Sequence, residues 1–444
     1  MLKFLFVSMF LIMCGWGETG LVLSSLAVMF LFINPIYMSI SGFFLELDWI
    51  SWNLILLSVW VILLSIFSSM KIYFFNKLNK LYLCVMIFLF LFLVLTFLVS
   101  DFMLFYMMFE ACLIPILLII LGWGYQPERS QAGVYMFFYT LFGSLPLFFI
   151  IIYMNKYIGS SYMFFDKNYI FNSVLIFFFM ITGFLVKFPM YSVHLWLLKA
   201  HVEAPVAGSM ILAGVLLKLG GYGLIRFSFF FFDESMLLIK EFILVFSLWG
   251  GLFLSLACLR FMDMKLLIAA SSVVHMSSCI CGIFILTDWG IKGCLLMMVA
   301  HGLCSSGLFC LANIVYERTN SRSMNLNKGL LNILPVFSMW WFLLIVCNMA
   351  GPPSLNLVSE IMLLISIINW NKFSIVILFF LGFFSAAYSL YLYSLSQHGV
   401  FVKNKSKFSG GLVFEYFVLF LHWVPLNILI LMSALMLCLN GFVI

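Results

Sequence analysis

The chain has 444 residues, of which 66% are hydrophobic and only 9% are charged, and its formal net charge is +6. A water-soluble domain carries roughly 25% charged residues, so this composition excludes a chain whose surface mostly faces water. The mean hydropathy is +1.21, and the apolar runs are continuous, which excludes a transmembrane β-barrel with its alternating strands. The composition therefore predicts an all-α, polytopic membrane protein.

The apolar runs divide into fourteen predicted helices, since a helix needs about 20 apolar residues to cross a bilayer core. In chain order these spans are 2–14, 20–38, 53–70, 81–99, 101–121, 133–154, 170–198, 205–226, 242–259, 266–286, 290–315, 332–369, 373–396 and 415–440. The seventh and the twelfth are too long for one ordinary helix. Each contains proline, Pro189 in the seventh and Pro352-Pro353 in the twelfth. Because proline breaks the helical hydrogen-bond ladder, we expect each to be one broken span.

The lysine and arginine residues of the loops predict the orientation of these helices. Seven of the 22 cations fall on the side that holds both termini, and thirteen fall on the other side. The more basic side normally faces the compartment in which the protein is made. Both termini are therefore predicted to lie on the outer side.

Six titratable side chains remain at membrane depth after the loops are set aside: Glu110, Lys187, Lys218, His275, His301 and Glu360. A charge at the centre of a membrane helix costs about 2.5–3.5 kcal/mol on insertion scales. Such residues are rare, and chains of them mark routes for protons or ions. The six residues lie on six different predicted spans and carry both signs of charge, which favours a proton relay.

Each of the six also has a purely structural interpretation. Lys187 lies just before Pro189 and could cap a helix end, and Glu110 could form a structural ion pair with a lysine. A lone histidine in a helix commonly has a structural role. Glu360 follows Pro353 by seven residues and could serve a helix terminus. These alternatives remain open from the residues alone.

The small residues around Lys218 predict the direction of its side chain. Ala207, Gly214 and Gly221 recur every seven residues, and Lys218 falls on the same helix face. Small residues let neighbouring membrane helices approach closely. We therefore expect Lys218 to point into the protein and not towards lipid.

Two matching offsets indicate an internal repeat. Pro189 and Pro353 are 164 residues apart, and Glu110 and His275 are 165 residues apart. A repeat of five helices follows, and an odd number of helices makes the two copies inverted in the membrane. The predicted divisions are 1–80 with helices 1–3, 81–228 with the first repeat, 240–398 with the second repeat, and 412–444 with the last helix.

The cysteine pattern gives no support for a bound cofactor. The eleven cysteines include no Cys-x-x-Cys pair, although iron–sulfur ligation needs a recognised multi-cysteine spacing. Glycine-rich nucleotide-binding motifs are also missing from the sequence. We expect buried free thiols, and neither a cofactor nor a metal in this chain.

Several segments resemble the antiporter-like subunits of NADH:quinone oxidoreductase, and above all the mitochondrial members of that family. The matching segments are Phe109–Pro115, Tyr125–Arg129, Lys187–Ser209, Leu212–Gly223, Ser271–Met276, Ala300–Leu303 and Pro352–Glu360. The motifs are long and specific, and the resemblance extends over essentially the full length. It implies a fold of fourteen helices with two inverted five-helix repeats and broken helices 7 and 12.

The resemblance also implies roles for the six buried residues. Glu110 and Lys187 match the coupling ion pair of the family, and Lys218 matches its central proton carrier. His275 and His301 match linking positions, and Glu360 matches the terminal site. Bacterial relatives commonly carry lysine at this last position, whereas glutamate agrees with the mitochondrial members.

The activity implied is that of a proton-translocating subunit of NADH:ubiquinone reductase without a redox centre of its own. NAD, FMN, iron–sulfur clusters and ubiquinone are then expected in other subunits. The implied partners are other membrane-arm subunits, including neighbouring antiporter-like ones, accessory subunits and lipids such as cardiolipin, but no nucleic acid. The implied location is the mitochondrial inner membrane, with both termini on the intermembrane-space side. The alternatives are a stand-alone cation/proton antiporter and a scaffold subunit.

Overall fold

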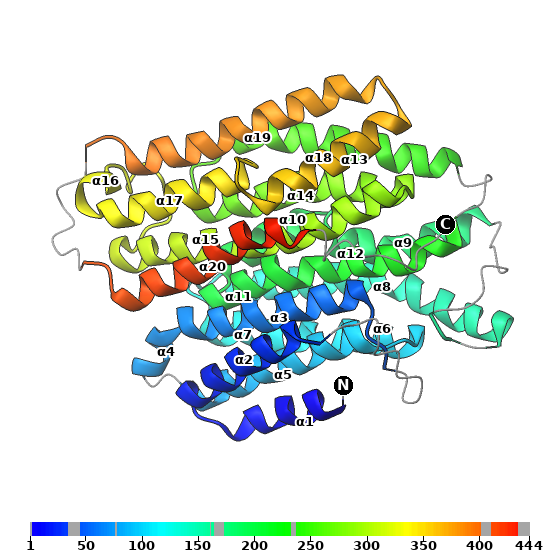
Figure 1. The fold of residues 1–444 in the computed structure, drawn as a ribbon, viewed down its shortest axis with the longest axis horizontal. Helices are drawn as coiled ribbons and strands as arrows, with labels where there is room; N and C mark the ends of the chain where they lie inside the picture. Colours follow the sequence, from blue (N-terminus) through cyan, green and yellow to red (C-terminus); the bar gives the residue numbers. More distant parts are fainter. Residues whose placement is uncertain are drawn as a thin grey trace. The chain divides into compact units, whose positions relative to one another are not determined.

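The computed structural model describes residues 2–33, 45–75, 78–159, 161–163, 173–231, 237–400 and 410–433, and these residues fold almost entirely as helices (Figure 1). Ten helices are long and apolar enough to cross a membrane. They are Trp49–Ser68, Asn79–Leu98, Phe102–Trp123, Arg129–Tyr157, Val206–Phe227, Leu237–Cys258, Met264–Ile285, Asp288–Thr319, Ser374–Gln397 and Val413–Leu431. The chain is thus an all-α polytopic membrane protein, as predicted.

Five further apolar helices are shorter, with 10 to 17 residues, which is why the structure counts fewer spans than the fourteen predicted. They are Phe4–Met13, Trp16–Leu31, Val174–Lys187, Pro335–Asn348 and Leu355–Trp370. The ends of the predicted spans 20–38 and 415–440, and part of the predicted division 412–444, lie outside the described residues.

The chain separates into two compact units. The first comprises Met1–Phe188 and Glu203–Lys240. Its helices are α1 (Leu2–Phe10), α2 (Trp16–Leu31), α3 (Trp49–Ser68), α4 (Met70–Phe74), α5 (Asn79–Leu98), α6 (Phe102–Ala111), α7 (Leu113–Trp123), α8 (Arg129–Ile158), α9 (Val174–Lys187), α11 (Val206–Ile211) and α12 (Leu217–Phe227). A π-helical turn, Leu212–Leu216, joins α11 to α12. Within this unit, α3 packs against α2, α5 and α11, and α9 packs against α8 and α12.

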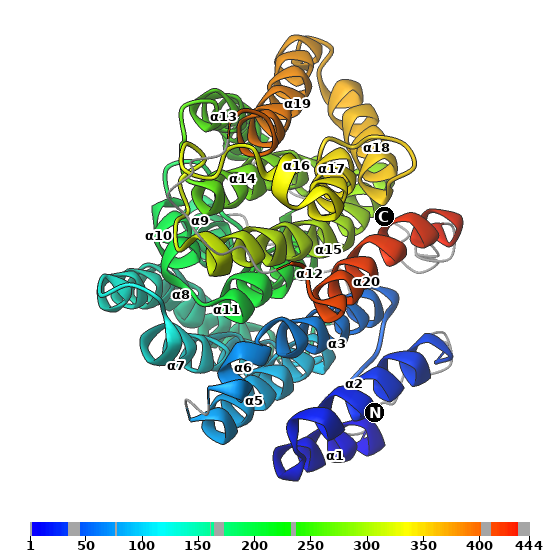
Figure 2. The same ribbon diagram turned by 90° about the vertical axis from the view of Figure 1, so that its left-hand side faces the viewer.

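The second unit comprises Pro189–Val202 and Glu241–Cys438. Its helices are α10 (Leu195–Glu203), α13 (Leu237–Cys258), α14 (Met264–Ile285), α15 (Asp288–Thr319), α16 (Leu330–Ile333), α17 (Pro335–Asn348), α18 (Leu355–Trp370), α19 (Ser374–Gln397) and α20 (Val413–Leu431). The long helix α15 is the centre of this unit, with α14, α17, α18 and α20 packed around it (Figure 2). Helices α14, α15 and α18 carry His275, His301 and Glu360.

Three of the helix interruptions in the described residues lie beside proline. α9 ends at Lys187, two residues before Pro189, and α17 gives way to α18 across Pro352-Pro353. The predicted span 101–121 is two helices, because Pro115 has no N–H for the carbonyl of Ala111 and the helix is interrupted at Cys112. Interrupted helices leave backbone groups that must find partners inside the protein.

Glycine allows α9 and α12 to pack at backbone distance. A Cβ atom on Gly220 would lie 2.6 Å from the backbone nitrogen of Phe188, and a Cβ on Gly223 would collide with the ring of Phe184. Both positions therefore need glycine because of the close approach. The contact fixes the end of α9, which carries Lys187, against the helix that carries Lys218.

We expect Gly220→Ala to destabilise the assembled subunit by about 1–3 kcal/mol, since overpacking against backbone cannot be relieved by a side-chain rotation. The measurement is the amount of assembled enzyme and its midpoint of thermal inactivation. The control is Gly122→Ala on α7, where a Cβ would meet no atom within 4 Å. Equal assembly and equal midpoints for the two variants would show that the close approach is not required.

Candidate functional site

Glu110 and Lys187 form an ion pair inside the first unit. The Lys187 Nζ lies 3.3 Å from the Glu110 Oε1, and the two side chains are 4% and 14% exposed. The Lys187 ammonium also donates to the carbonyl oxygen of Phe109 at 2.7 Å and lies 3.0 Å from the centroid of the Phe109 ring. A carboxylate, a carbonyl and an aromatic face thus surround one ammonium group.

The local backbone explains why the pair forms there. Glu110 is in the last turn of α6, just before the interruption at Cys112, and Lys187 is the last residue of α9. The last carbonyls of a helix have no helical N–H partner and favour a nearby cation. Lys187 therefore binds the carboxylate of Glu110 and the backbone carbonyl of Phe109, both in the last turn of α6.

Lys218 lies in the first unit in a wholly buried environment, as its small-residue face predicts. Its relative exposure is 0%. It follows the π-helical turn Leu212–Leu216 by two residues, and its Nζ donates to the carbonyl oxygen of Ala213 within that turn. A π-helical turn shifts the hydrogen-bond ladder and often marks a functional position. Here it provides a backbone acceptor for an ammonium group at membrane depth.

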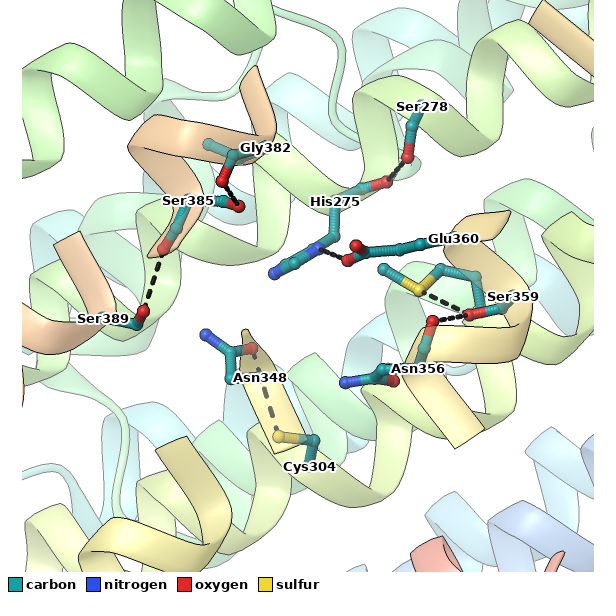
Figure 3. A network of polar contacts seen from close by, with 12 residues as sticks. His275, Ser278, Cys304, Asn348, Asn356, Ser359, Glu360, Gly382, Ser385 and Ser389 are labelled. Carbon is teal, nitrogen blue, oxygen red and sulfur yellow. Dashed lines mark hydrogen bonds and ion pairs between the residues drawn. The ribbon is translucent and has the colours of Figure 1, made fainter. Parts of the chain in front are cut away.

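His275 is held from both sides of its ring in the second unit. Its Nδ1 lies 3.3 Å from the Oε1 of Glu360 on α18, as Figure 3 shows. Its Nε2 lies 3.5 Å from the hydroxyl of Tyr388 on α19. The ring of His301 on α15 lies with its centroid 5.5 Å from that of His275. Four helices therefore bring four titratable side chains to one place.

Polar groups continue from this cluster to the break between α17 and α18. Figure 3 shows Asn348 and Asn356 in the same region as Glu360. The side-chain amide of Asn356 donates to the carbonyl oxygen of Cys347 at 2.6 Å, and Asn356 is fully buried. The thiol of Cys304 lies 4.0 Å from the Oδ1 of Asn348. The interrupted helix thus contributes amides and a carbonyl beside the histidine–glutamate pair.

The structure brings five of the six sequence-predicted residues into direct contact groups. Glu110 and Lys187 pair in the first unit, and His275, Glu360 and His301 gather in the second, whereas Lys218 bonds to backbone. Sequence reasoning missed Phe109 and Tyr388. A usable signal for Tyr388 was the polar second half of α19, where Ser385 and Ser389 flank it.

The described residues include cysteines and other side chains of the kinds that bind metal ions. The ten cysteines in the described residues are all free, and eight of them are buried. Across the ranges that the structure describes, no three His, Cys, Asp or Glu side chains lie close enough to hold a metal ion.

Comparison with known proteins relates this architecture to a family. Residues 1–96 match the family model described as "NADH-ubiquinone oxidoreductase chain 4, amino terminus", and residues 99–385 match "NADH:quinone oxidoreductase/Mrp antiporter, TM". The chain is 54% identical to NADH-ubiquinone oxidoreductase chain 4 of Ceratitis capitata over 88% of each chain. The chain belongs to the NADH-ubiquinone oxidoreductase chain 4 family. It is therefore a membrane subunit of NADH:ubiquinone oxidoreductase, respiratory complex I.

Other members and relatives of the chain 4 family agree over nearly the whole length. The Locusta migratoria chain 4 is 46% identical over 97% of this chain and 98% of its own. A chain of the structure "Respiratory complex I from Thermus thermophilus with bound NADH" aligns with a TM-score of 0.86, covering 98% of this chain and 96% of that one. At 20% identity, that likeness shows that the fold is shared.

We expect Tyr388→Phe to lower the turnover of the assembled enzyme by about two- to tenfold, because one hydrogen bond contributes roughly 0.5–1.5 kcal/mol. The hydroxyl holds the Nε2 side of His275, and its loss frees the ring to rotate. NADH oxidation and proton release are measured together. Tyr391→Phe on the same helix is the control, since that hydroxyl contacts the sulfur of Met262. Equal rates in the two variants would contradict the role of Tyr388.

Proposed function

We propose that this subunit translocates protons across the mitochondrial inner membrane through Glu110, Lys187, Lys218, His275, His301 and Glu360. The observation that supports this most strongly is the pairing of a buried basic side chain with an acidic one within each unit, Lys187 with Glu110 and His275 with Glu360. Charged groups are expensive in an apolar interior and are retained there for ion or proton transfer.

The proposed mechanism is a change of proton affinity driven by movement of a charge. Burial disfavours a lysine ammonium, and a nearby carboxylate favours it. We propose that a neighbouring subunit disturbs the Glu110–Lys187 pair and thereby loads or unloads Lys218. A proton then passes to His275 and His301, whose imidazole nitrogens can take up and release a proton, and on to Glu360.

The energy for this transfer comes from outside the chain. Moving one charge against a membrane potential costs about 2.3 kcal/mol per 100 mV. We propose that redox chemistry at NAD, FMN, iron–sulfur clusters and ubiquinone in other subunits supplies it. The partners are then neighbouring antiporter-like subunits, accessory subunits and lipids such as cardiolipin.

The same proposal includes the finer fold and the orientation. We place fourteen helices in the membrane, with inverted repeats over 81–228 and 240–398 and with both termini on the intermembrane-space side. The matched offsets of Pro189 with Pro353 and of Glu110 with His275 support the repeat.

Replacement of Glu110 by Gln or of Lys218 by Met is expected to lower both turnover and the number of protons moved per electron pair. The reason is that each variant removes a station whose charge must change during transfer. The measurement is proton uptake into vesicles that contain the complete enzyme, normalised to assembled enzyme. The controls are Glu241→Gln and Lys372→Met, which alter exposed residues of the same types.

Three outcomes separate the proposal from its rivals. Normal turnover and stoichiometry in Glu110→Gln and Lys218→Met would refute the relay. Lower assembly with normal pumping in the enzyme that does assemble would favour a scaffold. Exchange of Na⁺ or K⁺ for protons by the purified chain alone would favour a stand-alone antiporter.

A further inference from the structure

A second buried ion pair of the first unit lies at the end of the helix that carries Lys218. The Nη1 of Arg226, in the last turn of α12, lies 2.7 Å from the Oδ2 of Asp48, the residue before α3. The arginine side chain is 4% exposed and that of Asp48 is 31% exposed. None of the six relay residues takes part in this pair.

Three polar residues of α12 lie on one face because they are four positions apart: Lys218, Tyr222 and Arg226. At a rise of 1.5 Å per residue, Arg226 is roughly 12 Å along the helix from Lys218. Tyr222 lies between them, 1% exposed, and its hydroxyl donates to the carbonyl oxygen of Phe97 at 3.2 Å. The Cζ of Arg226 lies 4.9 Å from the centroid of the Tyr222 ring.

Three chain segments form a backbone cap, and the first of these segments ends two residues before Asp48 in the sequence. The N–H of Glu46 donates to the carbonyl of Leu98, that of Phe102 to Ser161, and that of Met163 to Ser100, each at 2.7 Å. Isolated β-bridges join Leu45 to Val99 and Asp101 to Tyr162. The carbonyl that Tyr222 uses, that of Phe97, is next to this cap in sequence. The polar face of α12 therefore ends against fixed backbone and a paired arginine.

We propose that Arg226, locked by Asp48, is a barrier that prevents protons on Lys218 from escaping along this face of α12. The inference rests on the proposed relay, since it gives Lys218 a single permitted direction of discharge. A guanidinium keeps its proton in proteins, so it cannot act as a stepping stone. A permanent cation beside a narrow polar path also repels a hydrated proton, as arginine does in water channels.

The carboxylate of Asp48 makes the proposed barrier distinguishable from a purely structural ion pair by experiment. With Arg226 present, Asp48 is bound to the guanidinium. Without it, Asp48 becomes a carboxylate that can take up a proton at the end of the Lys218–Tyr222 face. Arg226→Gln and Asp48→Asn both break the ion pair, but only the first removes the cation and leaves a proton acceptor. A purely structural link between α3 and α12 would make the two variants behave alike.

The test uses the complete enzyme in sealed vesicles with an imposed pH gradient and without NADH, so that only passive proton flux is measured with an internal pH dye. The flux per assembled enzyme is expected to rise severalfold in Arg226→Gln. It is expected to stay at the wild-type level in Asp48→Asn and in the double variant. It is expected to rise less in Arg226→Lys than in Arg226→Gln, because the ammonium is still a cation but, unlike a guanidinium, can release its proton. Arg226→Lys is also the control for folding. The amount of assembled enzyme is compared between Arg226→Lys and Arg226→Gln.

Adding Lys218→Met to Arg226→Gln is expected to abolish the extra flux, because the escaping proton then has no donor. The barrier is refuted if Arg226→Gln shows no extra flux, if Asp48→Asn leaks as much, or if the leak survives Lys218→Met. These outcomes are separate from failure of the relay. That failure would be seen as normal proton pumping in the Lys218→Met enzyme, whatever the passive flux.

Discussion

The cost of keeping charge in an apolar interior governs the arrangement of this chain. Lys187, Lys218 and Arg226 are each no more than 4% exposed. Each of these cations is stabilised in the same way, by acceptor groups at a helix end or at an irregular helical turn. Lys187 uses the end of α6, Lys218 uses the π-helical turn, and Arg226 uses Asp48 at the start of α3. A regular helix has no spare carbonyl in its interior, so irregular backbone is the condition for burying these charges.

The interrupted helices therefore also place backbone groups where polar side chains can bond to them. At the break between α17 and α18, Ala350 has a positive φ of 57°, and the residues around it expose the Cys347 carbonyl to Asn356. Ser192, in the segment between α9 and α10, has a positive φ of 54°. Non-glycine residues in this backbone region cost energy and persist where surrounding structure enforces them. Both lie in the spans that proline marks in the sequence.

The sequence was sufficient for some features of the site and insufficient for others, for physical reasons. Helical class and the inward direction of Lys218 follow from hydropathy and from the spacing of Ala207, Gly214 and Gly221, which are local properties. The partners of each buried charge are distant in sequence, as with Lys187 and Phe109, and no periodicity specifies them. The π-helical turn was not predicted, because one extra residue per turn leaves no mark in composition. Tyr388 was missed because an aromatic residue in an apolar helix is ordinarily packing.

The Lys187–Glu110 pair and the His275–Glu360 pair differ in their basic side chain, and this difference suits them to different roles. An ammonium releases its proton only when its surroundings strongly disfavour charge, and Lys187 has a carboxylate, a carbonyl and a ring face within reach. Such a group suits the holding of charge and the sensing of an electric field. An imidazole exchanges protons near neutrality and has two nitrogens. His275 presents one to Glu360 and the other to Tyr388, so it can accept on one side and donate on the other. In the proposed relay, the first pair accordingly holds a charge and the second passes a proton on.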